Sequence, residues 1–266
     1  MNILPIIVLY NVDYLVTNVY RSLLINYEGT RILIYENSPE PQNSHYESGT
    51  VMYHHDKMNG GVSAAYNYGA ALAKACKDID AILLLDEDTQ FQPDYLDVLD
   101  KALKSHPDID LFVPQVIYAK NLPFSPVHRR LRKDRGAFLS EGVYSLKDYL
   151  PVNSGACLRL SAFDAVGGYN PKIRLDFADF DFFSRMAEVS EVFYLVNSTA
   201  YQAFSNEETQ VDKLFRRYQF YLEGAHEAKL NKLISTSVKI ETLRHTLALS
   251  WRTRSMAFLI YLLHHV

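Results

Sequence analysis

Apolar runs that end abruptly in polar side chains recur along the first half of the chain. The strand-like runs are 5–10, 31–35, 51–54, 81–85 and 111–118, and a further one follows at 152–160. Segments with helical spacing occupy 13–26, 62–77 and 95–104. Continuous apolar runs are typical of strands buried on both faces, and apolar residues at every third or fourth position are typical of amphipathic helices. Their alternation predicts an α/β fold with a mostly parallel central sheet flanked by helices.

Polar residues and glycines stand at the carboxyl ends of four of these predicted strands. They are Tyr10, Asn11, Glu36, Asn37, Asn59, Gly60, Asp86, Glu87 and Asp88. Parallel sheets bind ligands at the carboxyl ends of their strands, so we expect these residues to surround one ligand. Gly60 fits either an ordinary turn or a helix N-terminus whose free N–H groups bind an anion. Glu36 fits either a solvated carboxylate or an acceptor for the imide N–H of a pyrimidine base.

The fourth apolar run, 81–85, leads directly into three acidic residues. Residues i and i+2 of an extended segment point the same way, so Asp86 and Asp88 can converge on one divalent cation. Carboxylate oxygens suit Mg²⁺ or Mn²⁺, which bridge to substrate phosphates. The alternative is a solvated acidic turn, because carboxylates are common in turns.

A second acidic cluster contains Asp176, Asp179 and Asp181, interleaved with phenylalanines. We expect a helix to begin near Asp179. The acids then either stabilise its first turn through the helix dipole or supply a general base whose pKa is raised by desolvation.

Composition places the chain among globular α/β proteins. Its 48% of hydrophobic residues is ample for a sizeable core. Cys76 and Cys157 lack metal-ligand or disulfide spacing, and we expect core thiols in a reducing, cytoplasmic setting. No apolar run reaches about 18 residues, so no membrane-spanning helix is expected. Segment 119–148 is expected to be a loop or short helices. Its basic run, 128–135, is interpreted as a solvated face, with contact to phosphates or lipid head groups as the alternative.

The C-terminal part of the chain differs in charge and pattern. Segments 209–228 and 229–250 have helical spacing, and 256–263 is an apolar run too short to span a bilayer. From Lys229 onward six Lys and Arg residues accompany one acidic residue, whereas the whole chain has 27 basic and 31 acidic residues. We expect peripheral contact with the inner membrane surface, with packing back on the domain or a homodimer contact as alternatives.

Five stretches, in the same order as in the family, resemble the GT-A glycosyltransferases of the inverting family 2. Within that family they most resemble the bacterial rhamnosyltransferase-like enzymes of surface polysaccharide synthesis. The stretches are 35–38, 59–69, 85–88, 153–156 and 176–185, and the resemblance covers about 4–205. It implies a glycosyltransferase domain over 1–205, with a nucleotide-binding half (1–118) and an acceptor-side half (119–205). A helical region, 206–266, follows.

The resemblance also implies roles. Asp179 would be the catalytic base, Asp86 and Asp88 would hold Mg²⁺ or Mn²⁺ with the donor diphosphate, and Glu36 would read the base. Expected near the nucleotide are Tyr10, Asn11, Asn37, Asn59, Gly60, Asp86 and Glu87. The implied donor is a dTDP- or UDP-sugar, dTDP-rhamnose among them. The acceptor would be a glycan or lipid-linked molecule of O-antigen or capsule synthesis, and no nucleic-acid partner is expected.

Three departures from the family pattern keep other functions open. Glu36 replaces the usual Asp, Ala178 replaces the usual Glu, and 201–204 lacks a histidine that often binds metal. The alternatives are a HAD-type phosphatase with Asp86 as nucleophile, a nucleotidyltransferase, and a catalytically inactive sugar-nucleotide-binding subunit.

Overall fold

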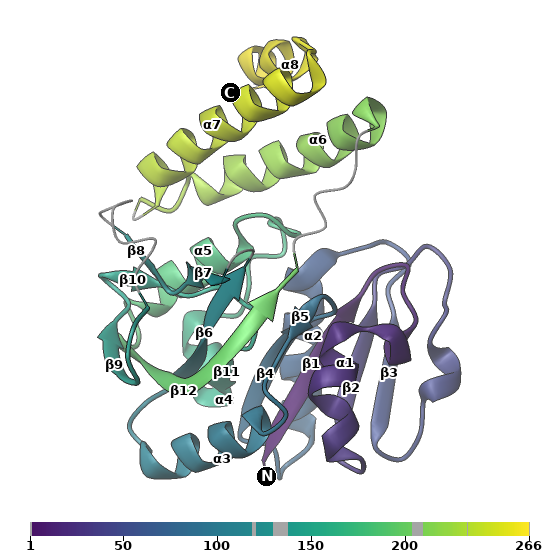
Figure 1. Ribbon diagram of the computed structural model, residues 1–266, viewed down its shortest axis with the longest axis vertical. Coiled ribbons are helices and arrows are strands. Elements are labelled where there is room, and N and C mark those ends of the chain that lie inside the picture. Colours follow the sequence, from purple (N-terminus) through teal and green to yellow (C-terminus); the bar gives the residue numbers. More distant parts are fainter. Residues whose placement is uncertain (1, 119–120, 130–137, 204–209, 233, 266) are drawn as a thin grey trace.

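A central, mostly parallel sheet organises the protein, as the apolar runs predict (Figure 1). The computed structural model describes residues 2–118, 121–129, 138–203, 210–232 and 234–265. The main path of the sheet runs β3 (Val51–His55), β2 (Ile32–Glu36), β1 (Ile3–Leu9), β4 (Ala81–Asp86), β11 (Cys157–Arg159), β6 (Leu111–Tyr118), β12 (Val192–Gln202), β5 (Thr89–Gln90). Beside this path, β7 (Leu122–Ser125) pairs with β6 and β9 (Gly142–Ser145) pairs with β12, while β8 (Val127–His128) pairs with β10 (Tyr149–Leu150).

The register of the parallel strands aligns their carboxyl ends. Leu9 of β1 lies opposite Glu36 of β2, and Val8 lies opposite Asp86 of β4. The polar residues that follow these strands therefore meet at one edge of the sheet, as expected from the sequence. Strand β11 runs antiparallel to both β4 and β6, and the short strands β5, β7 and β9 are also antiparallel to their neighbours.

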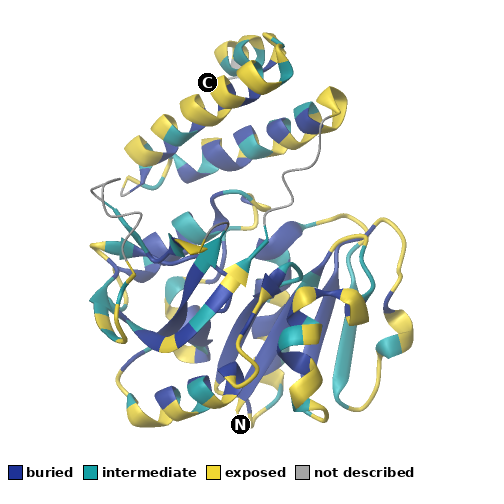
Figure 2. Ribbon diagram, viewed as in Figure 1, coloured by how far each residue is buried: buried dark blue, intermediate teal, exposed yellow. Residues whose placement is uncertain are grey.

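Helices cover both faces of the sheet. The helices α2 (Gly61–Ala75), α4 (Leu160–Val166) and α5 (Ala178–Met186) pack on one face, and α1 (Asn18–Ser22) and α3 (Tyr95–Ser105) pack on the other. Alternate residues of β1 supply the two cores: Leu4 and Ile6 point to the first, and Ile3 and Ile7 to the second. Figure 2 shows the resulting buried strands beneath partly exposed helices.

Two expected elements differ from those observed. Segment 13–26 is not one helix but two short 3₁₀ helices, Tyr14–Val16 and Leu24–Tyr27, on either side of α1. Thr17 causes the first break, because its hydroxyl accepts a hydrogen bond from the Tyr20 N–H as the cap of α1. The strand expected over 152–160 is shorter, because Gly155 adopts a φ of 82° in a turn and β11 begins only at Cys157.

Segment 119–148 was expected to be a loop or short helices. Its described residues form the strands β7, β8 and β9 instead. Most of the basic run, 130–135, lies outside the described residues.

The C-terminal helices α6 (Val211–Ala228), α7 (Ser235–Thr253) and α8 (Ala257–His265) form a separate layer (Figure 1). α6 packs back on the domain, since the rings of Tyr221 and Phe177 lie 4.9 Å apart. A small apolar cluster joins the three helices: Leu214, Tyr218, Leu222, Leu249 and Phe258. Across the described residues, no helix combines the length and apolarity needed to cross a bilayer. The domain division at residue 205 stays a prediction.

Candidate active site

Asp86 lies at the carboxyl end of β4, partly exposed at the edge where the strand ends meet. Its Oδ2 accepts a hydrogen bond from the Ser154 hydroxyl, and its Oδ1 accepts one from the Tyr66 hydroxyl at 3.3 Å. Burial raises the pKa of Asp86, and these two hydrogen bonds oppose the rise because they favour the ionised form. Asp86 is thus held in place by residues of α2 and of the turn before β11.

Glu87 and Asp88 follow in the same turn. The Tyr10 N–H donates to a Glu87 oxygen at 2.8 Å, which joins the ends of β1 and β4. Burial and the charges of Asp88 and Asp86 raise the pKa of Glu87 to about 7 despite this hydrogen bond. Burial and the Asp86 charge raise the pKa of Asp88 to about 6. Neighbouring carboxylates with raised pKa values favour a cation, since a positive charge would stabilise all the ionised forms.

The donor set limits how a metal could bind. Among the residues that the structure describes, no three His, Cys, Asp or Glu side chains form a group suited to a metal ion. Two Asp carboxylates, 86 and 88, fit Mg²⁺ or Mn²⁺ only if a ligand supplies further oxygens. That is the usual arrangement for Mg²⁺ bound with substrate phosphates.

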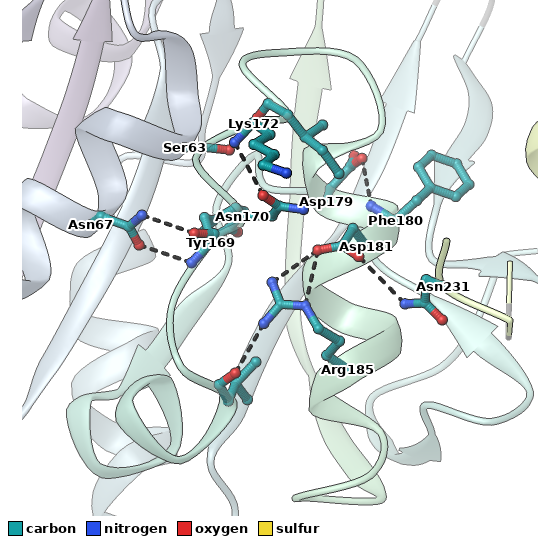
Figure 3. Close-up of polar contacts among 12 residues, drawn as sticks. Ser63, Asn67, Tyr169, Asn170, Lys172, Asp179, Phe180, Asp181, Arg185 and Asn231 are labelled. Atoms are coloured by element: carbon teal, nitrogen blue, oxygen red, sulfur yellow. Dashed lines mark hydrogen bonds and ion pairs between the residues drawn. The ribbon is translucent and has the colours of Figure 1, made fainter. Parts of the chain in front are cut away.

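Asp179 occupies the first turn of α5, and its Oδ1 accepts a hydrogen bond from the Phe180 N–H at 2.8 Å (Figure 3). Burial raises the pKa of Asp179 to about 7, with further contributions from the charges of Asp86 and Asp176. Asp86 and Asp179 are far apart in sequence, but packed rings connect their surroundings. The Tyr66 hydroxyl donates to Asp86, and Tyr169 packs on Tyr66 at 5.3 Å and stacks on Phe182 of α5 at 4.1 Å. A carboxyl group with a pKa near neutrality is suited to proton transfer.

The other two acids of this region have basic side chains as neighbours. Asp181 forms an ion pair with Arg185 at 2.9 Å, and Asn231 donates to its second oxygen at 3.4 Å (Figure 3). Burial raises the pKa of Asp176, while Arg217 of α6 and His245 of α7 oppose the rise. Asp181 therefore fixes α5, and Asp176 faces the C-terminal helices. The alternative in which all three acids only stabilise the helix dipole therefore does not suit Asp179, whose pKa is raised to about 7.

Four further residues at the cluster were not among the sequence-based candidates. Tyr66 and Ser154 hold Asp86, and the Gln202 amide oxygen lies 3.4 Å from the Ser154 hydroxyl. Tyr169 packs against Tyr66 at 5.3 Å and donates to Asn153 at 2.6 Å. Tyr66 and Ser154 lie inside motifs that were singled out, but no local pattern marks either as a partner of Asp86.

Glu36 lies inside the protein and not at an open surface. It is 0% exposed, and its carboxylate accepts hydrogen bonds from the Tyr53 hydroxyl at 2.8 Å and from the N–H groups of Gln42 and Asn43 at 3.1 Å. Burial alone would raise its pKa, but these hydrogen bonds lower it overall. In this conformation Glu36 anchors the loop after β2, and recognition of a base by Glu36 stays a prediction.

The N-terminus of α2 was expected to offer free N–H groups to an anion. The N–H groups of residues 60, 61 and 62 instead donate to Asp56, to Asn37 and to the Arg174 carbonyl. These donors are therefore already engaged. The remaining candidates shape the same edge: Asn11 and Asn59 adopt positive φ values of 54° and 51°, and the Tyr10 side chain is 49% exposed.

Comparisons with known proteins agree with this fold. The sequence model of the family described as "Glycosyl transferase family group 2" matches residues 81–266. The chain is similar in structure to GalNAc-T7 crystallised with UDP, GalNAc and Mn²⁺, at 13% identity and a TM-score of 0.55, covering 77% of this chain and 44% of that one. It is also similar to S. aureus TarS 1–349 in complex with UDP, at 12% identity and a TM-score of 0.57, covering 87% of this chain and 66% of that one. A search of curated proteins found no match.

The sheet, the acidic residues at the carboxyl ends of its strands and the family match together define a glycosyltransferase of the GT-A fold. The chain belongs to glycosyl transferase family group 2.

Proposed function

We propose that the protein transfers a sugar from a nucleoside diphosphate to an acceptor hydroxyl, with inversion at the anomeric carbon and Asp179 as general base. The observation that carries the proposal is the position of Asp179 in the first turn of α5, joined to Asp86 through the packed rings of Phe182, Tyr169 and Tyr66. Burial raises the pKa of Asp179 to about 7, and the charge of Asp86 contributes to the rise. A base with this pKa is partly ionised near neutral pH and still accepts a proton readily.

The reaction follows from this arrangement as one displacement. Asp179 takes the proton from an acceptor hydroxyl, whose oxygen attacks the anomeric carbon from the face opposite the diphosphate. The bond from that carbon to the diphosphate oxygen breaks, and the nucleoside diphosphate leaves with the electron pair. One displacement of this kind inverts the anomeric configuration.

Asp86 and Asp88 are the residues we assign to Mg²⁺ or Mn²⁺ together with the donor diphosphate. A bound divalent cation would neutralise the charge that grows on the leaving group. Ser154 and Tyr66 support this role, because they orient the Asp86 carboxylate and favour its ionised form. GalNAc-T7, which shares the fold, was crystallised with Mn²⁺ and UDP, and TarS with UDP.

The donor we propose is therefore a UDP- or dTDP-sugar. Its acceptor is proposed to be a glycan or lipid-linked molecule, as in polysaccharide synthesis. The family assignment favours sugar transfer over the phosphatase and nucleotidyltransferase alternatives.

A donor screen followed by product analysis tests this function. We expect UDP- or dTDP-sugars to raise the melting temperature in the presence of Mn²⁺, and GDP-sugars to raise it less. With a stabilising donor and a hydroxyl acceptor, NMR of the new glycosidic bond should show the anomeric configuration opposite to that of the donor. Retention of configuration would contradict the single displacement, and donor binding without any product would indicate the inactive binding subunit.

A further inference from the structure

The outer side of α7 carries a row of exposed apolar side chains. They are Ile240, Leu243, Leu247 and Trp251, with exposed fractions of 48%, 51%, 49% and 88%. Their spacing of three and four residues places them on one face of the helix. The opposite face carries the buried residues Val238, Thr242, Thr246 and Leu249, and the Thr246 hydroxyl lies 2.6 Å from that of Tyr218 in α6. One side of α7 is therefore buried against its neighbours, while the opposite side carries an apolar row that is left exposed.

The segment leading into α8 and α8 itself repeat this pattern. Met256, Ile260 and Leu263 are 63%, 52% and 82% exposed, whereas Phe258 is fully buried in the cluster shared with α6. Both helices lie beyond α6 from the sheet, and exposed positions recur along them (Figures 1 and 2). We call these seven exposed, large apolar side chains, four on α7 and three in 256–263, the outer apolar stripe.

An apolar stripe of this extent marks an interaction surface. Scattered exposed apolar residues are normal, but a contiguous patch on a monomer usually binds a protein or a membrane. Trp251 is the most exposed large hydrophobic residue of the stripe. Tryptophan is enriched where membranes meet water, because its ring is apolar and its N–H stays hydrated.

The charges beside the stripe distinguish between these partners. Lys239, Arg252 and Arg254 are exposed on or directly after α7. Two copies meeting through a two-fold axis would bring this positive surface against itself, which is unfavourable. An anionic surface matches both the charge and the apolar stripe.

We propose that α7 and α8 dock on an anionic lipid surface, with the outer apolar stripe at the boundary of head groups and acyl chains. The neighbouring Lys and Arg side chains then reach the head-group phosphates. Helix α6 lies between this surface and the site: Gly224 packs on the Asp176 carbonyl, and Tyr221 packs on Phe177. Docking thus holds the acidic cluster close to the membrane, and it does not depend on the proposed sugar transfer.

Trp251 makes the proposal directly measurable, because the chain has one tryptophan. Its fluorescence would be recorded during titration of the whole protein with vesicles of phosphatidylglycerol and phosphatidylcholine, and with vesicles of phosphatidylcholine alone. We expect a blue shift and cosedimentation with the anionic vesicles, both reduced by high salt. Leu247→Glu should lower the partition coefficient between water and anionic vesicles about tenfold or more, because it removes one inserted apolar side chain.

Val189→Glu is the matched control, since Val189 is 47% exposed in the turn after α5. It should bind vesicles like the parent, and equal melting temperatures would show that both variants fold. The proposal fails if Trp251 emission and sedimentation do not change with anionic vesicles, or if Leu247→Glu binds them as the parent does. It also fails if the blue shift follows protein concentration without lipid and sedimentation shows a dimer.

Discussion

Ser154 donates its hydroxyl hydrogen to the carboxylate of Asp86, although Ser154 lies in the turn before β11 and Asp86 at the end of β4. The contact is set by the backbone around it. The Gly155 N–H donates to the Leu84 carbonyl at 2.9 Å, and the Leu84 N–H donates to the Ala156 carbonyl at 2.9 Å. Residues 155 and 156 thus pair with β4 immediately before Asp86, which places the Ser154 side chain beside the carboxylate.

Replacing Ser154 tests whether this contact prepares Asp86 for a cation. We expect Ser154→Ala to weaken Mn²⁺-dependent donor binding and transfer by roughly 10- to 100-fold, as is typical for a lost partner of a metal ligand. Calorimetric titration of donor at several Mn²⁺ concentrations measures the effect. Ser105→Ala, at the exposed end of α3, is the control and should behave as the parent. Unchanged Mn²⁺ affinity in Ser154→Ala would argue against metal binding by Asp86.

The pKa of Asp179 predicts how the transfer rate depends on pH. A general base must be ionised, so the rate should rise about tenfold per pH unit below the pKa of about 7 and level off above it. A bound cation near Asp86 should move this limb to lower pH, because an opposite charge favours the ionised carboxylate. Rate profiles at low and saturating Mn²⁺ measure both effects. A rate that is flat between pH 5 and 8 (roughly two units below to one above this pKa) would contradict the role of Asp179.

The sequence predicts the frame of the site better than its contacts. The apolar runs define β1, β2, β4 and β6 because a strand buried on both faces needs apolar residues throughout. Their polar ends then identify the edge where Asp86 lies. The Ser154 contact could not be predicted, because it depends on β11 entering the sheet antiparallel between β4 and β6. Likewise, no local pattern shows that the loop at Gln42 folds back so that its N–H groups donate hydrogen bonds to the Glu36 carboxylate.

Glu36→Gln separates an anchoring role from recognition of a base. The variant loses the charge on three hydrogen bonds, and we expect it to be destabilised by about 1–3 kcal/mol, or a few degrees in melting temperature. Because the pKa of Glu36 is lowered on folding, this stabilisation is present at neutral pH and should disappear as the pH falls below 4.5.

Thermal unfolding of Glu36→Gln at several pH values measures this loss. Glu40→Gln, an exposed residue of the same loop, should melt with the parent. An unchanged melting temperature in Glu36→Gln, combined with lost discrimination between UDP- and GDP-sugars, would instead support recognition of the base.

Gly61 joins α2 to the segment that precedes α5. Its φ is 74°, and a Cβ atom there would lie 2.0 Å from the Arg174 carbonyl oxygen, which also accepts the Val62 N–H. We expect Gly61→Ala to cost about 2–4 kcal/mol, because backbone strain is added to a displaced carbonyl. Chemical denaturation measures this cost. Gly29→Ala is the matched control: its φ is 87° with nothing within 4 Å, so strain alone should cost about 1 kcal/mol. Equal losses in the two variants would show that the contact with Arg174 is unimportant.

The most direct test of the proposed mechanism compares turnover and donor affinity in Asp179→Asn. The amide keeps the shape of the side chain but cannot accept the acceptor's proton. We expect kcat to fall about 10²- to 10⁴-fold, while the donor dissociation constant stays close to that of the parent. Asp108→Asn, on the exposed turn after α3, should leave both quantities unchanged. If Asp179→Asn transfers sugar at the parent rate, Asp179 is not the base and the proposed mechanism is wrong.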